Sequence, residues 1–515
     1  MDRGDGQTAN RWEDTTDFFE AAYPKNKSLV QRMHRMFYPQ TVALVGASAN
    51  PAKWGNRVLH SILSGGFGGR VVPVNPKGGK ILGMDVAPSL EAVPGPIDLV
   101  LIVVPPEHVM GVLADCVRLD VGSVFMITAG FSESGPEGHE REAQMHRLLS
   151  RAGIPLGGPN GQGITCTQAD LCAQMFPIVP PKGGISLVAQ SGNVGVSLSH
   201  KAVYHNIGLS KTISAGNEAS LTTADYLDYL ADDRDTKVIA VYLEGVDDGR
   251  RFLAAMSRAA RKKPVVVLKS GRTNFGARAA VSHTGALAGS DRIYDGALRQ
   301  AGAQRVFDLE ELFDAAAAFA TMPLPRGNRL ALVTEGGGWG VLASDAAADQ
   351  GLDLAPLPQE VIATLDQLLP PRWSRNNPID FVAADDPRTT RKTFQMLLES
   401  SQYDAVAWLG VGYVSLSAAL VSESTLSREP GAAQVLDMLV QEDRRLARDV
   451  LAMARSSGKT FLFASDAAIS AQVIGNPALD ALREQGCHVY PSPERALRAL
   501  GHLVRYADWR RRMAE

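Results

Sequence analysis

The sequence predicts an α/β protein built from three doubly wound domains. Short runs of apolar, mostly β-branched residues alternate with segments of helical pattern, and most runs end in glycine or other small residues. Such alternation is typical of open, mostly parallel sheets with helices on both faces. Apolar residues make up 45% of the 515 residues, enough for sizeable cores, and this length suggests about three domains.

The first candidate strands are unbroken apolar runs rather than alternating ones. Unbroken runs suit parallel strands that are covered on both faces. The residues before about residue 30 have no strong pattern, so we expect them to form an extension. The candidate strands are Thr41–Val45, Val71–Val74, Leu99–Val104 and Ser123–Ile127.

A strand, a turn of glycine or small residues, and a helix recur three times along the chain. Successive turn glycines are 146 and 145 residues apart, which predicts three α/β domains of similar size. The three segments are ALVGASANPAKWG from Ala43, SLVAQSGNVG from Ser186 and ALVTEGGGWG from Ala331. We place an N-terminal extension at 1–30 and domains at 31–165, 166–325 and 326–515.

Composition argues against several classes of protein. The chain has 52 Lys and Arg against 55 Asp and Glu, so its formal charge of −3 gives no reason to expect nucleic acid or an anionic membrane as partner. The four cysteines lack C-x-x-C spacing, so we expect no metal site, redox dithiol or disulfide scaffold. The apolar runs are far shorter than the ~20 residues that span a bilayer, and the polar N-terminus does not resemble a secretory signal. We therefore expect a soluble cytoplasmic protein.

The glycine turns are candidate anion sites, because backbone N–H groups at a helix N-terminus bind phosphate without a basic side chain. The first turn is not the G-x-G-x-x-G of nicotinamide enzymes, and the second strand ends in Asn75-Pro76-Lys77 instead of an acidic residue. Lys77 suits a phosphate, which favours a phosphorylated nucleotide other than NAD. Alternatively, Lys77 is a solvated turn residue. The sequence also lacks a Walker A motif, a nucleophile elbow and H-E-x-x-H.

His283 differs in its surroundings from the other histidines. It lies in Gly276–Ser290, a stretch of almost only small residues that is a poor core element but can form a loop carrying one reactive side chain. Imidazole is a competent nucleophile near neutral pH, and a phosphohistidine would need helix N-termini around it. The turns Ser191–Asn193 and Gly336–Gly338 could supply these. From the residues alone, a catalytic and a non-catalytic role for His283 both stay open.

The segment KSGRTNFGARAAVSHTGALAGSD resembles the phosphohistidine loop of the ADP-forming acyl-CoA synthetases, whose superfamily includes succinyl-CoA synthetase. The resemblance continues in family order from about residue 35 to the end of the chain. FYPQTVALVGASANPAKWGNRVL resembles the start of the CoA-binding domain, VIAVYLEGVDDGRRF a segment with a Glu beside the histidine, and LVTEGGGWGVLASDAA the third domain. The resemblance implies an N-terminal Rossmann-like CoA-binding domain followed by two flavodoxin-like ligase domains.

The resemblance also implies a role for each matching residue. His283 would carry phosphate, Glu244 would accept a hydrogen bond from the imidazole, and Glu218 would be a second carboxylate. Alternatively, Glu244 ends a strand and pairs with Arg250 or Arg251. Phosphate would bind at Ser191, Gly192, Asn193, Gly337 and Gly338. The CoA nucleotide would bind at Gly46, Ser48, Asn50 and Lys77, with Val104, Pro105, Ile127 and Thr128 along its path, and Asn160 would meet the substrate.

The implied reaction is acid + ATP + CoA ⇌ acyl-CoA + ADP + phosphate. The sequence ends without the ATP-grasp module of this family, so we expect a separate beta subunit that holds ATP or ADP and Mg²⁺, in a hetero-oligomer of two alpha and two beta subunits (α₂β₂). The segment matching Ile127–Ala129 departs from succinyl-CoA synthetase, which makes succinate doubtful and leaves the carboxylic acid open. The alternative is a non-catalytic regulatory protein that binds CoA or acyl-CoA on the same scaffold.

Overall fold

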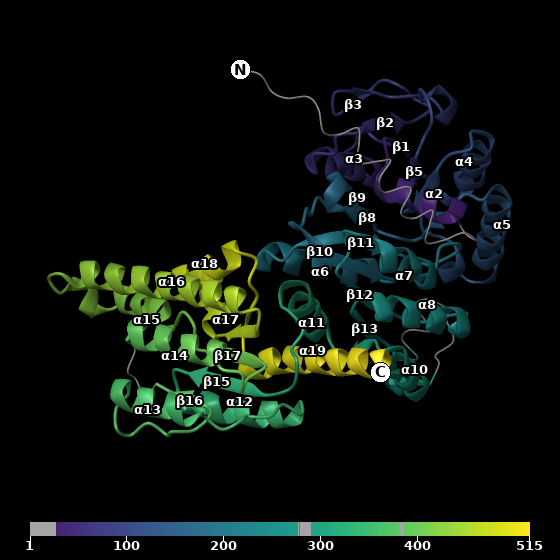
Figure 1. The fold of residues 1–515 in the computed structure, drawn as a ribbon. Coiled ribbons are helices and arrows are strands. Elements are labelled where there is room, and N and C mark those ends of the chain that lie inside the picture. Colours follow the sequence, from purple (N-terminus) through teal and green to yellow (C-terminus); the bar gives the residue numbers. More distant parts are fainter. Residues whose placement is uncertain (1–26, 277, 279–289, 382–385) are drawn as a thin grey trace, which may run out of the picture. The chain divides into compact units, whose positions relative to one another are not determined.

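The computed structural model describes residues 27–276, 278, 290–381 and 386–515, and these form two compact units (Figure 1). The first unit comprises the described residues up to Val203 together with Gly208–Val306. The second comprises Tyr204–Ile207 and Phe307–Glu515. Among the described helices, none is long and apolar enough to cross a bilayer.

The first sheet of the first unit has five parallel strands in the order β2-β1-β5-β6-β7. Every residue of β1, β5 and β6 is buried, which explains their unbroken apolar runs. The strands are β1 (Thr41–Val45), β2 (Arg70–Val74), β5 (Leu99–Ile102), β6 (Ser123–Met126) and β7 (Leu156–Gly157), with the small hairpin β3 (Lys80–Ile81) and β4 (Met84–Asp85). The helices are α2 (Lys27–Phe37), α3 (Trp54–Ser64), α4 (Pro106–Arg118) and α5 (Pro136–Ala152), with 3₁₀ turns Leu90–Ala92 and Ser132–Ser134.

The second sheet of this unit has the order β14-β13-β12-β10-β11-β8-β9, in which β8 and β9 run antiparallel to their neighbours. Helix α3 packs against β9, so the two sheets of the unit are joined. The strands are β8 (Gly163–Cys166), β9 (Leu171–Gln174), β10 (Lys182–Ala189), β11 (Leu209–Ser214), β12 (Val238–Leu243), β13 (Val265–Lys269) and β14 (Gln304–Val306). The helices are α6 (Gly192–His205), α7 (Thr223–Asp232), α8 (Gly249–Lys262) and α10 (Asp291–Ala301), with a 3₁₀ turn at Thr167–Ala169.

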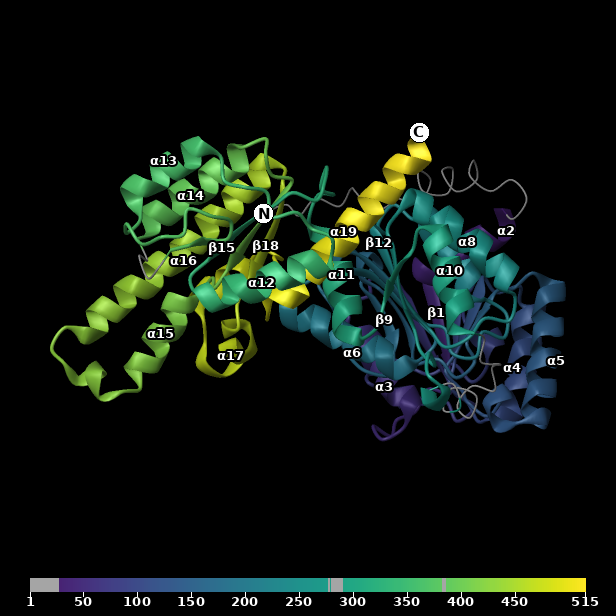
Figure 2. The ribbon, with the colours of Figure 1, turned by 90° about the horizontal axis from the view of Figure 1, so that it is seen from below.

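The second unit contains one sheet of five parallel strands, β16-β15-β17-β18-β19. Helices α12 and α11 pack against α19, and α15 and α16 pack against each other and extend together beyond the sheet (Figure 2). The strands are β15 (Leu330–Thr334), β16 (Ile379–Asp380), β17 (Ala405–Leu409), β18 (Thr460–Ala464) and β19 (Val489–Tyr490). The helices are α11 (Leu309–Thr321), α12 (Gly337–Asp349), α13 (Gln359–Leu368), α14 (Pro387–Glu399), α15 (Tyr413–Ser422), α16 (Ala432–Ser457), α17 (Ala467–Ile474), α18 (Pro477–Glu484) and α19 (Pro493–Ala514), with a 3₁₀ turn at Thr425–Arg428.

All three sheets share one strand order. Numbered along the chain, the parallel strands of each sheet lie in the order 2-1-3-4-5. Each glycine turn follows the first of these strands, which lies between the second and the third. This is the switch point where ligands of open α/β sheets bind. The predicted fold class, three doubly wound α/β domains, is confirmed. The domain limits stay predictions; of the extension, residues 1–26 lie outside the described residues, and α2 begins at Lys27.

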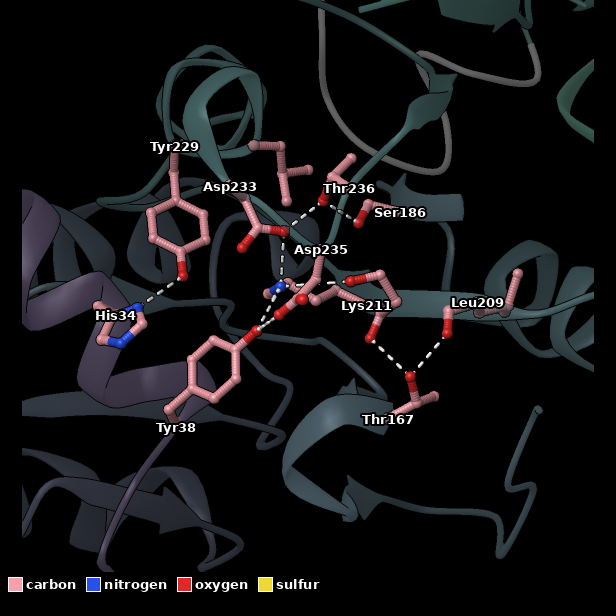
Figure 3. A network of polar contacts seen from close by, with 12 residues as sticks. His34, Tyr38, Thr167, Ser186, Leu209, Lys211, Tyr229, Asp233, Asp235 and Thr236 are labelled. Atoms are coloured by element: carbon pink, nitrogen blue, oxygen red, sulfur yellow. Dashed lines mark hydrogen bonds and ion pairs between the residues drawn. The ribbon is translucent and has the colours of Figure 1, made fainter. Parts of the chain in front are cut away.

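A buried ion pair connects the end of α2 to the second sheet within the first unit (Figure 3). The Nζ of Lys211, on β11, lies 2.7 Å from a carboxylate oxygen of Asp233, and both side chains are almost completely buried. Lys211 Nζ also donates to the hydroxyl of Tyr38 at 3.1 Å, and that hydroxyl donates to Asp235. Burial lowers the pKa of the neighbouring His34 to about 4, so this imidazole is neutral at pH 7.

Candidate active site

The first glycine turn is tightly packed against the neighbouring strand. Gly46 has a φ of +95°, and a Cβ there would lie 2.4 Å from the carbonyl oxygen of Val103, so only glycine fits. The Ser48 hydroxyl oxygen accepts from the N–H of Asn50 at 3.1 Å. The Asn50 side chain in turn accepts from the N–H of Ala52 at 2.8 Å. Both predicted ligand residues therefore shape the turn with their own side chains.

Lys77 lies on the turn that follows β2, beside the first glycine turn. The side chain of Asn75 accepts from the Lys77 N–H at 2.9 Å and donates to the carbonyl of Ala47 at 2.8 Å. Asn75 thus ties the two turns together, while the Lys77 side chain is exposed. The arrangement places a cation and a helix N-terminus at the same switch point, where a phosphate group fits.

The ends of β5 and β6 are joined by a side-chain hydrogen bond. The Thr128 hydroxyl donates to the carbonyl of Val104 at 2.7 Å. Pro105 is exposed at the start of α4, but Ile127 is only 7% exposed, so Ile127 can offer a ligand little more than its backbone. Asn160 joins this group, because its N–H donates to the Thr128 carbonyl at 3.0 Å.

Asn217, on the loop after β11, connects Asn160 to two glutamates. The Asn217 side chain accepts from the Asn160 amide at 3.3 Å and donates to the carboxylates of Glu133 and Glu142. Burial raises the pKa of Glu133, but hydrogen bonds from Gly130 and Asn217 outweigh it and hold that pKa below its usual value. The Glu133 carboxylate is therefore ionised at neutral pH. Through its bond with Asn217 it links the first sheet to the loop that carries Glu218.

The second glycine turn starts α6 at the switch point of the second sheet. Ser191 and Gly192 are partly buried and Asn193 is exposed. The Gln162 amide donates to the Asn193 side-chain oxygen at 2.9 Å. A Cβ on Gly192 would lie 2.2 Å from Cγ of Gln162, so glycine permits this close approach to the helix N-terminus. The geometry leaves the start of α6 able to receive an anion.

Glu244 follows β12, next to the second turn. Its carboxylate lies near the hydroxyl of Tyr242. Burial raises the pKa of that hydroxyl and the Glu244 carboxylate adds to the rise, so the hydroxyl remains a donor. Arg251, the suggested alternative partner of Glu244, forms ion pairs with Asp225 and Asp228 on α7.

Glu218 has a left-handed backbone, with φ +58°. Burial raises the pKa of its carboxyl to about 7, with a smaller contribution from Asp225. Hydrogen bonds from Thr223 and the Gln190 side chain oppose that rise. Glu218 can therefore exchange a proton near neutral pH.

The third turn lies in the second unit, at the start of α12. A Cβ on Gly337 would lie 3.1 Å from a carboxylate oxygen of Asp380, so an anion is already present beside this helix N-terminus. Gly338 is exposed. His283, the predicted phosphocarrier, lies outside the described residues.

The structure thus joins some of the predicted residues of the first unit by hydrogen bonds. These connect Val104, Thr128 and Asn160 to Asn217, and Glu218 is the next residue in the chain. Many of the contacts around the predicted residues come from side chains that the sequence did not point to, namely Gln162, Gln190, Asn217, Glu133 and Tyr242. Only the position of Gln190, immediately before Ser191, could have drawn attention to it.

Three family models match the chain in order. They are the CoA binding domain over residues 40–167, the succinyl-CoA ligase like flavodoxin domain over 182–319 and the Ligase-CoA domain over 330–429. The alpha subunit of acetate–CoA ligase [ADP-forming] I from Pyrococcus furiosus is 34% identical over 94% of this chain and 99% of its own length. The chain belongs to the ADP-forming acyl-CoA synthetases.

Two further members of the ADP-forming acyl-CoA synthetases support the assignment. The alpha subunit of acetate–CoA ligase [ADP-forming] II, also from Pyrococcus furiosus, is 40% identical over 72% of this chain and 80% of its own length. The dinucleotide-forming acetyl-coenzyme A synthetase 1 of Ca. Korarchaeum cryptofilum, solved with phosphate and ADP, has a TM-score of 0.80 and 33% identity, covering 93% of this chain and 97% of that one. The predicted family is therefore confirmed.

Proposed function

We propose that this chain is the alpha subunit of an acid–CoA ligase (ADP-forming). The observation that carries the proposal is the match to an acetate–CoA ligase alpha subunit over 99% of that subunit's length. The strand order and the placement of the glycine turns support it, because each turn lies at the switch point of its sheet.

The proposed chemistry divides one difficult step into three easier ones. The imidazole of His283 attacks the γ-phosphorus of ATP and ADP leaves. A carboxylate oxygen of the acid then attacks the phosphohistidine, which forms an acyl phosphate and frees His283. Finally the CoA thiolate attacks the acyl carbon and phosphate leaves with the C–O electron pair. The sum is acid + ATP + CoA ⇌ acyl-CoA + ADP + phosphate.

In this proposal the residues of the first unit divide into two groups. The N-terminus of α6, with Ser191, Gly192 and Asn193, stabilises the charge of the transferring phosphoryl group. Glu244 orients the imidazole of His283, and Glu218 is a second carboxylate that exchanges a proton near pH 7.

The second group binds CoA and the acid. Lys77 and the first turn, with Gly46, Ser48 and Asn50, hold the CoA nucleotide. Val104, Pro105, Ile127 and Thr128 lie along its path, and Asn160 meets the acyl group. Gly337 and Gly338 are proposed as a further phosphate contact in the second unit.

The proposal includes a partner with an ATP-grasp module. That partner holds ATP or ADP with Mg²⁺, and the assembly contains two alpha and two beta subunits in the cytoplasm. The support is that two relatives are alpha subunits by name. The acid is a small carboxylic acid, and its identity is a matter for screening.

The test is phosphate transfer to His283. We would incubate the chain with an ATP-grasp partner and γ-labelled ATP, and separately with labelled acetyl phosphate, beside a His283→Ala control. Acid-labile, base-stable label on the wild type and none on the variant is the expected result. Calorimetric CoA binding without label under either condition would instead favour the regulatory alternative.

A further inference from the structure

The Gln190 side chain lies at the junction of the two loops that carry Glu218 and Glu244. Gln190 is the residue between β10 and the second glycine turn. Its Oε1 accepts from the backbone N–H of Gly245 at 3.1 Å and from that of Glu244. Its Nε2 donates to the carbonyl of Gly245 at 3.0 Å. The Gln190 side chain also lies close enough to the buried Glu218 carboxyl to lower its pKa.

These contacts leave the Gln190 amide only one orientation. The oxygen must face two N–H donors, and the nitrogen must face the Gly245 carbonyl. A flipped amide would place like groups against each other on both sides. One side chain therefore fixes the Glu244 backbone relative to the end of β10 and lies beside the Glu218 carboxyl.

We propose that Gln190 is a positioning residue for the phosphoryl transfer, acting through Glu218 and Glu244. The inference rests on the proposed function. The amide fixes the backbone of the Glu244 loop and favours the ionised form of the Glu218 carboxyl. The Thr223 hydroxyl donates to Glu218 directly.

The charged and titratable groups near Glu218 oppose its ionisation rather than assist it. Asp225 and Tyr226 face it from α7, and neither carries a positive charge. The Gln190 amide carries no charge, so it favours the ionised form of Glu218 without a cation.

The experiment compares Gln190→Met, which keeps the side-chain volume but removes donor and acceptor, with Gln190→Glu, which keeps only the acceptor. The full chain is labelled with acetyl phosphate at varied concentration, and CoA affinity is measured by calorimetry. We expect the rate constant of labelling at saturating acetyl phosphate (the labelling kcat) to fall about 10- to 100-fold for both variants. The KM for acetyl phosphate and the affinity for CoA should not change. Gln174→Met, at a buried glutamine bonded to the Ile178 carbonyl, is the matched control and should keep the wild-type kcat.

A double-mutant cycle separates positioning from a merely structural role. In a Glu218→Gln background, Gln190→Met should cost less than about 3-fold, since neighbours that act through one another are not additive. The inference would be overturned, while the proposed function stands, if the Gln190 variants were labelled at the wild-type rate. It would also be overturned if the activation free energies lost by Gln190→Met and by Glu218→Gln added in the double variant. A wild-type chain that takes no label from acetyl phosphate, and none from γ-labelled ATP with an ATP-grasp partner, would overturn both the inference and the proposed function. Should Gln190→Met fail to fold, Gln190→Glu still decides the outcome.

Discussion

Glu218 combines two features that are unfavourable in a folded protein. Its φ of +58° is rare outside glycine and costs on the order of 1 kcal/mol or more. Its carboxyl is buried enough to raise the pKa to about 7. The hydrogen bond from the Thr223 hydroxyl holds the carboxyl in place and opposes the rise of its pKa, so burial is the main cause of that rise. A carboxyl whose pKa lies near neutral pH is typical of residues that transfer protons.

Glu218→Gln should therefore change stability in a pH-dependent way. The folded pKa of about 7 lies above the ordinary value of 4.5, so the wild-type carboxyl destabilises the fold progressively as pH rises from 4.5 to 7. Gln does not ionise. We expect the free energy of unfolding of the variant, relative to wild type, to be greater at pH 8 than at pH 5 by up to about 3 kcal/mol.

Chemical denaturation at the two pH values measures this difference. Glu137→Gln is the control, because the Glu137 side chain is 91% exposed. The free energy of unfolding of this variant should differ from that of the wild type by the same amount at both pH values. An equal effect of Glu218→Gln at pH 5 and pH 8 would contradict the raised pKa. The phosphoryl transfer rate of the variant should fall together with the loss of the carboxylate.

At the scale of elements, the glycine turns depend on close backbone packing. Gly46→Ala would force a Cβ to within 2.4 Å of a carbonyl oxygen at a φ of +95°. We expect a loss of stability of about 2 kcal/mol or more and a loss of CoA affinity of at least about tenfold, because the turn must move away from the Val103 carbonyl. Calorimetry with CoA and thermal unfolding check both.

Gly111→Ala provides the contrast, in a helix that follows a strand of the same sheet. Gly111 lies inside α4, and a Cβ there would meet no atom within 4 Å. Alanine is the better helix former, so this variant should gain about 0.5–1 kcal/mol and bind CoA normally. Equal behaviour of Gly46→Ala and Gly111→Ala would refute the packing argument for the first turn.

The strand–turn–helix repeats were predictable because their signals are local. Thr41–Val45 is an unbroken apolar run, and the glycines of the turns stand directly after such runs. The polar chain of the site was not predictable in this way. Asn217 meets Glu133 across 84 positions and Gln190 meets Glu244 across 54, so no spacing rule connects them. The positions of Glu218 and Glu244 were suggested only by family resemblance, and their roles stay predictions.

At the scale of the whole molecule, the first unit contains a buried charge pair that is hydrogen-bonded to a residue distant in sequence. Lys211 and Tyr38 are 173 positions apart, and the pair of Lys211 with Asp233 is almost completely excluded from water (Figure 3). Burying two charges gains little net stability, but removing one partner leaves the other uncompensated. The hydroxyl of Thr236, which also donates to Asp233, cannot replace the ammonium charge.

Lys211→Met should therefore reduce the free energy of unfolding by about 3–5 kcal/mol. The double variant Lys211→Met/Asp233→Leu should lose less than the sum of the single losses, because it removes both charges together. Lys80→Met is the matched control: its ion pair with Asp85 is exposed at 71% and 88%, so it should change stability by less than about 1 kcal/mol. Denaturant titration of the wild type, the two single variants Lys211→Met and Asp233→Leu, the double variant and Lys80→Met measures the series. A Lys211→Met loss no larger than that of Lys80→Met would show that the buried ammonium of Lys211 is not needed to balance Asp233.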